Sequence, residues 1–364
     1  MGKPVAKSGD IVTVLETSRV FVKNRNFFWT FWVEGMSYSL SFTKGKDSEA
    51  VAVVRNGPYD GEILYLHDNE AKKERPEPKK EFSPTKYLSQ MKGMKPTDRV
   101  RLSAKIQEAL DKKQEELVGE SKEMKELYQQ IKRDVEKDKS IELPSDSTYF
   151  PIPNPDPNVR SVVYCAGMSG SGKSYFAKNY AENYIKLFPS RSIYLVSQLE
   201  HDETLDNLKV NGKVCPPKRL DYKSFVKNPP TMEEFEDPCL IIFDDYDCIA
   251  DPYGKAVQQM IDMIAIQGRH SGEGKGNGQG TSMLVLSHFL SNYRKTRLIL
   301  GEAQSMVLYP YSTSYKALQY VCQHHCGLSK EEVQGLKKLG RWVLIKKTYP
   351  SYLISAHTAY MLNQ

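Results

Sequence analysis

Long apolar runs, an apolar leader and a dense set of cysteines are all missing from this sequence. No run approaches the ~18 consecutive apolar residues of a membrane-spanning helix, so we expect no membrane span. The first ten residues, MGKPVAKSGD, contain no apolar segment, so we expect no secretory signal. The six cysteines do not suggest a disulfide framework, and Cys165, Cys239 and Cys248 lie in or beside apolar runs. We expect these three to be reduced core residues of a soluble, cytoplasmic protein.

A strong excess of one charge is also missing. The chain has 51 Lys and Arg against 45 Asp and Glu, a formal net charge of +6. This balance permits a polyanionic partner but does not require one, because affinity for nucleic acid depends on where the basic groups lie. The 364 residues, 40% of them hydrophobic, suffice for roughly one large and one small globular domain.

The pattern along the chain predicts three parts. Residues 1–70 contain short strand-like runs separated by turn signals and predict a small β-rich domain for docking or oligomerisation. Residues 71–157 predict a charged linker, helical between Asp98 and Lys139 and then broken by five prolines. The strands expected in the first part are 11–15, 27–33, 37–43, 51–54 and 62–66.

Residues 158–364 alternate unbroken apolar runs with helical segments, which predicts an α/β domain with a mostly parallel central sheet flanked by helices. One of the expected helices is Lys255–Gly268. The expected strands are 161–166, 192–197, 239–244, 282–287, 305–309 and 342–345.

A glycine-rich loop follows the first of these strands and precedes a helical run. This context of strand, loop and helix predicts a P-loop for ATP, with backbone N–H groups and the helix N-terminus facing the phosphates. We expect Lys173 to reach the β- and γ-phosphates and Ser174 to bind Mg²⁺. The predicted nucleotide-binding residues are Gly167, Met168, Ser169, Gly170, Ser171, Gly172, Lys173, Ser174 and Tyr175.

The strand ending in Asp244 and Asp245 supplies the second half of the site. Ligands bind at the carboxyl ends of strands in open α/β sheets, where these two carboxylates emerge. We expect Asp244 to hold Mg²⁺ through its water shell and Asp245 to polarise the attacking water. Asp247 is interpreted as a solvated turn residue.

Polar residues beyond these motifs are candidates for contact with the γ-phosphate. Ser287 and His288 close the next apolar strand, and Ser287 is our first candidate for this sensor role. Arg269, Arg294 and Arg297 are candidates for stabilising charge at the γ-phosphate, with Arg269 preferred and supplied from a neighbouring subunit.

The order of these motifs, with Gly268-Arg269-His270 between the acidic strand and the strand ending in a polar pair, resembles the genome-packaging ATPases of large DNA viruses. These are poxvirus-type members of the FtsK–HerA superfamily, and the resemblance covers roughly residues 160–310. It implies a homo-oligomeric ring that uses ATP and Mg²⁺ to drive double-stranded DNA into a capsid. It also implies a capsid or portal partner, and a place in the host cytoplasm or virus factory or with the virion.

The resemblance implies a basic channel in that ring, but the sequence does not choose its residues. The candidates are Arg269, His270 and Lys275, or the C-terminal Lys337, Lys338, Arg341, Lys346 and Lys347. Three other functions stay open: a helicase-like or DNA-transfer ATPase, a small-molecule kinase with a P-loop, and a nucleotide-binding scaffold that does not hydrolyse ATP.

Overall fold

The structure is a computed structural model, and it describes part of the chain. The described residues are 38–68, 88, 95–112, 114, 116, 117, 119–137, 140–235, 238–270, 280–292 and 294–362. They fall into two compact units: the helical unit, within 88–137, and the large unit, formed by 38–68 with 140–362. The expected strands 11–15 and 27–33 and the residue Lys275 lie outside the described residues.

The helical unit contains two helices with a small core of its own. α2 (Pro96–Asp111) and α3 (Lys122–Lys137) account for most of the helical stretch expected between Asp98 and Lys139, but the described residues between the two helices are not helical. On α3, Met124, Tyr128 and Ile131 recur at helical spacing and pack with Leu102 and Ile106 of α2. The Tyr128 hydroxyl donates to the backbone oxygen of Gln114 at 2.7 Å, so the buried ring satisfies its polar end on the chain between the helices.

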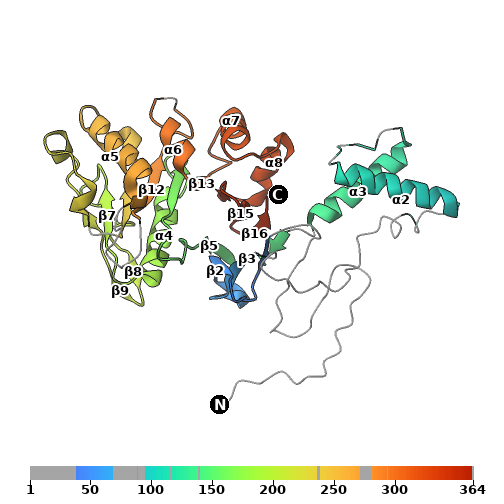
Figure 1. Ribbon diagram of the computed structural model, residues 1–364, viewed down its shortest axis with the longest axis horizontal. Coiled ribbons are helices and arrows are strands. Elements are labelled where there is room, and N and C mark those ends of the chain that lie inside the picture. Colours follow the sequence, from blue (N-terminus) through green and yellow to red (C-terminus); the bar gives the residue numbers. More distant parts are fainter. Residues whose placement is uncertain are drawn as a thin grey trace, which may run out of the picture. The chain divides into compact units, whose positions relative to one another are not determined.

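The large unit is built on a ten-stranded sheet (Figure 1). Its order is β10-β7-β11-β12-β6-β13-β14-β15-β16-β4. The bounds are β10 (Lys218–Arg219), β7 (Ile193–Val196), β11 (Leu240–Phe243), β12 (Ser282–Ser287), β6 (Val162–Ala166), β13 (Ser305–Leu308), β14 (Val343–Lys346), β15 (Tyr352–Ser355), β16 (Thr358–Met361) and β4 (Ser140–Glu142). All six strands expected after residue 158 are present, with ends shifted by at most one residue.

The sheet is mixed, which corrects the expectation of a mostly parallel sheet. Strands β10 through β13 pair in parallel, whereas β13 through β4 pair antiparallel. Two residues join β15 to β16, which requires antiparallel pairing because parallel neighbours need a much longer crossover. β13 and β14 also pair antiparallel, although residues 309–342 lie between them. The sequence analysis missed β15 and β16 because they lie close behind β14, without intervening helices.

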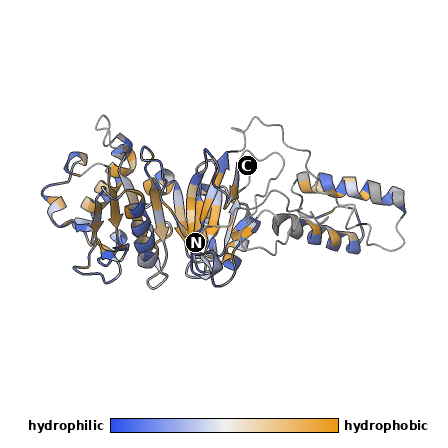
Figure 2. Ribbon diagram, turned by 90° about the horizontal axis from the view of Figure 1, so that it is seen from below, coloured by the Kyte–Doolittle hydropathy of each residue, from blue (hydrophilic) through white to orange (hydrophobic). Residues whose placement is uncertain are grey.

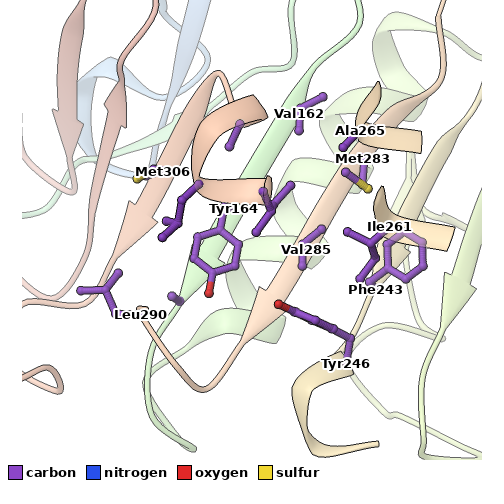
Figure 3. Close-up of a cluster of buried hydrophobic side chains, with 14 of the residues drawn as sticks. Val162, Tyr164, Phe243, Tyr246, Ile261, Ala265, Met283, Val285, Leu290 and Met306 are labelled. Carbon is purple, nitrogen blue, oxygen red and sulfur yellow. The ribbon is translucent and has the colours of Figure 1, made fainter. Parts of the chain in front are cut away.

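Both faces of the parallel half are buried, which explains its unbroken apolar runs. Alternate residues of β6 face opposite sides, with Val162 and Tyr164 in one core and Val163 and Cys165 in the other. Figure 3 shows the first core, which helices α5 and α6 cover together with α7. Figure 2 shows apolar strands between more polar helices. These helices are α5 (Tyr253–Gln267), α6 (Arg297–Glu302) and α7 (Tyr315–His325), followed by α8 (Lys330–Gly335).

Helix α4 (Lys173–Leu187) and a second sheet cover the other face. Phe176, Tyr180 and Tyr184 of α4 share a core with the four-stranded sheet β1-β3-β2-β5. Its bounds are β1 (Tyr38–Ser41), β3 (Ile63–Asp68), β2 (Glu49–Arg55) and β5 (Thr148–Pro151), and a separate hairpin pairs β8 (Lys209–Val210) with β9 (Lys213–Val214). Three strands expected before residue 70 are thus present. Strands β4 and β5 lie in the segment expected to be a linker, and Pro151 is the last residue of β5.

The domain boundaries at 70 and 157 stay a prediction. The strands of residues 38–68 belong to the same compact unit as residues 140–362. Among the cysteines expected in the core, Cys165 and Cys239 are buried, but Cys248 is exposed. Cys248 lies in a short 3-10 turn beyond the end of β11, where its side chain leaves the sheet. In the described part of the chain, no helix is long and apolar enough to cross a membrane.

Candidate nucleotide site

The candidate site lies at one edge of the parallel half of the sheet. Register pairs Ala166 of β6 with Ser287 of β12 on one side and with Leu308 of β13 on the other. β11 and β7 run in the same direction, with Phe243 beside Val196. The carboxyl ends of all five strands therefore meet at one edge. The residues that follow them are Gly167, Asp244, His288, Ser197 and Tyr309.

The glycine-rich loop needs its glycines for two different reasons. Gly170 and Gly172 have φ angles of 72° and 112°, a region that strains any side chain. At Gly167 the limit is space, because a Cβ atom would lie 2.6 Å from the Tyr309 ring and 2.7 Å from the Ser171 hydroxyl. The Gly167 N–H donates to the Ser287 backbone oxygen at 3.0 Å, which ties the loop to β12. The loop therefore has a fixed path from β6 into α4.

Lys173 is the first residue of α4 and is almost fully buried under this loop. Its Nζ donates to the Gly167 oxygen at 2.9 Å and lies 3.4 Å from the Met168 oxygen. The same nitrogen is 3.3 Å from Asp245 Oδ1, within ion-pair range but without hydrogen-bond geometry. A bound phosphate would offer stronger, anionic acceptors to this ammonium group. The glycine-rich loop thus holds Lys173 where it would contact phosphates bound in that loop.

Asp244 is buried directly after β11. Its Oδ2 accepts a hydrogen bond from the Ser197 hydroxyl at 2.9 Å, at the end of the neighbouring strand β7. Burial, together with the adjacent Asp245 carboxylate, raises the pKa of Asp244 to about 6, although the Ser197 bond opposes that shift. Ser197 was missed in the sequence analysis. Its position could have indicated a role, because Ser197 directly follows a buried strand, as Asp244 does.

Asp245 connects the lysine to the loop after β12. It adopts the left-handed conformation, with φ 44° and ψ 41°, which turns its side chain back toward the P-loop. Its Oδ2 lies 2.8 Å from His288 Nε2, while its Oδ1 faces Lys173. A strained backbone at a residue with two such partners is typical of a functional position. Asp245, His288 and Lys173 form the polar centre of the site.

Asp247 is buried, which corrects its interpretation as a solvated turn residue. Its Oδ2 accepts from the Ser287 hydroxyl at 2.8 Å, from the His288 N–H at 2.9 Å and from the Phe289 N–H at 3.1 Å. Ser287 is therefore fully buried with its hydroxyl directed at Asp247. The turn after β11 brings the acid under the loop after β12, a contact between segments 40 residues apart that sequence spacing does not reveal.

The structure does not bring Arg269 together with the P-loop of its own chain. Helix α5 runs back along the sheet, so Gly268–His270 lies near the amino ends of the strands, where the Gly268 oxygen accepts from Thr281 N. Arg160, two residues before β6, caps the end of α5 there. The five residues of β6 separate this edge from the P-loop by about 17 Å. Arg294, by contrast, follows β12 on the P-loop edge and is exposed.

Among the C-terminal basic residues, three make contacts within the fold. Lys347 Nζ donates to the Leu300 and Gly301 oxygens at the end of α6. Lys346 lies 4.0 Å from Glu49. Arg341 donates to two carbonyl oxygens of the P-loop, a contact that sequence reasoning missed because 170 residues separate the partners. Lys337 and Lys338 are exposed.

Comparison with family models gave no match. A curated protein, the uncharacterised protein V3 of Sputnik virophage, is 31% identical over 206 residues, which cover 56% of this chain and 77% of the virophage protein. The chain belongs to the family of this virophage protein. A viral relative is in keeping with the viral group that the motif order resembles.

Solved structures give weaker similarities. The DNA-packaging ATPase B204 of Sulfolobus turreted icosahedral virus covers 54% of this chain and 98% of its own, with 14% identity and a TM-score of 0.38. The genome-packaging NTPase B204 of Sulfolobus turreted icosahedral virus 2, in complex with AMP, is 16% identical with a TM-score of 0.33. This match covers 53% of this chain and 94% of the B204 chain. The pCW3 conjugation coupling protein TcpA is 13% identical with a TM-score of 0.37, and the match covers 60% of this chain and 65% of TcpA. TM-scores this low do not establish a common fold.

The residues at this edge fit a magnesium-bound triphosphate. Asp244, Asp245 and the half-buried Ser174 supply oxygen atoms, which Mg²⁺ prefers. No group of three or more His, Cys, Asp or Glu suited to a metal occurs among the described residues, and Mg²⁺ usually relies on one or two carboxylates plus substrate phosphates. Ser171 Oγ and Asp245 Oδ1 are buried without a hydrogen-bond partner. Met168, Ser169 and Tyr175 are exposed around the loop, where a nucleotide can reach them.

Proposed function

We propose that this chain is a Mg²⁺-dependent ATPase that converts ATP to ADP and phosphate. One observation carries the proposal: a P-loop lysine and a buried acidic pair meet at the carboxyl edge of the sheet, with Lys173 Nζ 3.3 Å from Asp245. The glycine-rich loop and the start of α4 supply the N–H groups and the dipole that favour phosphate at this place. A glycine turn without a ligand would not need the acidic pair beside it, and an ion pair alone would not need the glycine-rich loop.

Each residue has a separate role in this proposal. Lys173 leaves the Gly167 and Met168 oxygens for the phosphates, and this releases Asp245 from its ion pair. Ser174 and Asp244 would hold Mg²⁺, which would neutralise charge on the phosphate oxygens. Asp245 then accepts a proton from the attacking water. His288 orients the Asp245 carboxylate, with Nε2 2.8 Å from Oδ2. The engaged hydroxyl of Ser287 makes His288 the better candidate for contact with the γ-phosphate.

We further propose that ATP hydrolysis drives movement along double-stranded DNA, with packaging of a viral genome as the most specific form. The motif order supports this step, and the virophage relative supports a viral origin. The exposed lysines Lys337 and Lys338 are the candidates for contact with the phosphate backbone, because Arg341, Lys346 and Lys347 are engaged within the fold. A capsid or portal partner belongs to the same proposal.

The position of Arg269 supports a ring of subunits. An arginine at the edge opposite its own P-loop can reach a γ-phosphate only in a neighbouring subunit, whose P-loop edge would face it. Arg294, on the same edge as its own P-loop, is the alternative within one chain.

The test of the enzymatic proposal measures ATP turnover with and without blunt duplex DNA, in the wild type and in Lys173→Ala. We expect the wild type to be stimulated by duplex DNA and the variant to be inactive. A fork substrate run in parallel separates the alternatives, because strand unwinding would favour a helicase-like ATPase. Transfer of phosphate to a nucleoside monophosphate without DNA stimulation would instead indicate a kinase.

The test of the shared site compares Arg269→Ala with Arg294→Ala. We expect Arg269→Ala to bind ATP normally and to lose hydrolysis. Mixing it with Lys173→Ala subunits should restore part of the activity, because each variant supplies the half that the other lacks. Full activity of Arg269→Ala alone, together with loss in Arg294→Ala, would assign the arginine to the same chain.

A further inference from the structure

Arg341 forms two hydrogen bonds to the backbone of the P-loop. Its Nε donates to the Ser171 oxygen at 2.7 Å, and its Nη2 donates to the Gly170 oxygen at 2.7 Å. One guanidinium group therefore holds two consecutive carbonyl groups of the loop. The rigid fork of an arginine suits this pair of acceptors, whereas a lysine offers a single point charge.

These two bonds fix the direction of the opposite side of the loop. Each peptide unit is planar and trans, so its N–H points away from its C=O. The carbonyls of Gly170 and Ser171 belong to the same peptide units as the N–H groups of Ser171 and Gly172. With both oxygens turned toward Arg341, those two N–H groups face the other way, into the loop, where Ser171 N–H donates to the Met168 oxygen at 3.1 Å. The clamp thus sets the direction of both N–H groups, and a phosphate bound in the loop would take the place of the Met168 oxygen at Ser171 N–H.

The fold holds Arg341 in place from both sides along the chain. β14 runs antiparallel to β13 with Val343 beside Leu308, so residue 341 lies at the same edge as the P-loop. Gly340, with φ 116°, provides the turn before it. Trp342 packs edge-on against Phe176 of α4, with ring centroids 5.8 Å apart. The segment therefore contacts both the P-loop and the helix that follows it.

We propose that Arg341 is a positioning residue of the nucleotide site, which keeps the P-loop in its phosphate-binding shape from the C-terminal half of the sheet. This inference rests on the proposed ATP-binding function. It assigns no contact between Arg341 and the nucleotide. Its effect is on the affinity for phosphates rather than on the chemical step.

The test measures Mg-ATP and Mg-ADP affinity, KM and kcat for Arg341→Gln and Arg341→Lys, with Lys330→Gln as the control. Lys330 is an exposed lysine at the start of α8. For Arg341→Gln we expect Kd and KM to rise about 10- to 100-fold, the range for lost hydrogen bonds to a charged donor. We expect kcat at saturating ATP to stay within about threefold. Arg341→Lys should not restore affinity, and Lys330→Gln should match the wild type.

The outcomes separate this inference from the function on which it rests. If the wild type and Lys330→Gln do not bind Mg-ATP, the proposed function fails. If both bind and Arg341→Gln binds equally well, the positioning role fails while the ATPase proposal stands. Thermal unfolding shows whether Arg341→Gln is folded. If it is not, the Mg-ATP affinity of Arg341→Lys tests the positioning role instead. Wild-type affinity in Arg341→Lys would overturn the role of the fork, and lowered affinity in a folded Arg341→Lys supports it.

Discussion

Replacing Asp247 with alanine is expected to loosen the loop after β12 and to destabilise the large unit. Three donors converge on Asp247 Oδ2, from Ser287, His288 and Phe289. Two of them have a second partner, because the Ser287 hydroxyl lies 2.9 Å from the Phe289 oxygen and Phe289 N lies 3.1 Å from Ser287 Oγ. The His288 N–H is left without its acceptor.

The cost follows from this count. Hydrogen bonds to a charged group contribute about 1.5–3 kcal/mol each, but the second partners offset two of the three losses. Asp247 Oδ1 is buried without a partner, so removing the carboxylate also relieves some desolvation. We therefore expect a loss of about 2–3 kcal/mol in the free energy of unfolding, and Asp247→Asn should lose about half of that. Turnover should fall about tenfold, because the His288 ring next to Asp245 loses its support.

Thermal unfolding of Asp247→Ala against Asp251→Ala measures the effect. Asp251 is the matched control, an acid four residues on whose side chain is 56% exposed and paired with Lys255 at 3.2 Å. Such exposed pairs contribute about 0–1 kcal/mol. We expect the melting temperature to fall by roughly 5–10 °C for Asp247→Ala and by about 2 °C or less for the control. Equal melting temperatures and normal turnover in both variants would refute the role of Asp247.

Three further predictions follow from the site and its surroundings. His288→Ala should keep ATP affinity within about threefold and lower kcat at least about tenfold, because its proposed contacts with Asp245 and the γ-phosphate act in the chemical step rather than in binding; a change confined to KM would contradict this. Lys337→Ala with Lys338→Ala should lower the slope of log K against log salt for duplex DNA by about 1.8, measured by titration at several salt concentrations, and an unchanged slope would remove both lysines from the interface. Burial raises the pKa of Cys165 to about 12, so this thiol should resist alkylation at pH 8 until the protein is unfolded, and mass spectrometry of the native protein checks it.

Local pattern was sufficient to predict the parallel half of the sheet, except for its two-residue edge strand β10, and the site's two sequence motifs. Unbroken apolar runs identified β6, β11 and β12 because both of their faces are buried. The glycines of the P-loop and the acids after β11 adjoin these strands, so their place at one sheet edge followed from strand direction alone. The roles given to Lys173, Asp244 and Asp245 stay predictions.

Contacts between distant segments were beyond the reach of the sequence. Arg341 and the P-loop are 170 residues apart, and nothing in a basic C-terminal segment distinguishes a clamp on a loop from a surface charge. Asp247 resembles an ordinary turn aspartate until the fold brings the end of β12 over it. Arg269 was selected by its position in the chain, and only the course of α5 shows that it lies at the opposite edge from its own P-loop.

The central claim is that one site at the carboxyl edge of the sheet binds and hydrolyses Mg-ATP. The most direct measurement is the rate of phosphate release from Mg-ATP by the wild type, Lys173→Ala and Asp244→Ala, each shown to be folded by thermal unfolding. The account predicts turnover by the wild type and a loss of at least about 100-fold in each variant, about 2.7 kcal/mol of transition-state stabilisation. Wild-type turnover in either variant would contradict it.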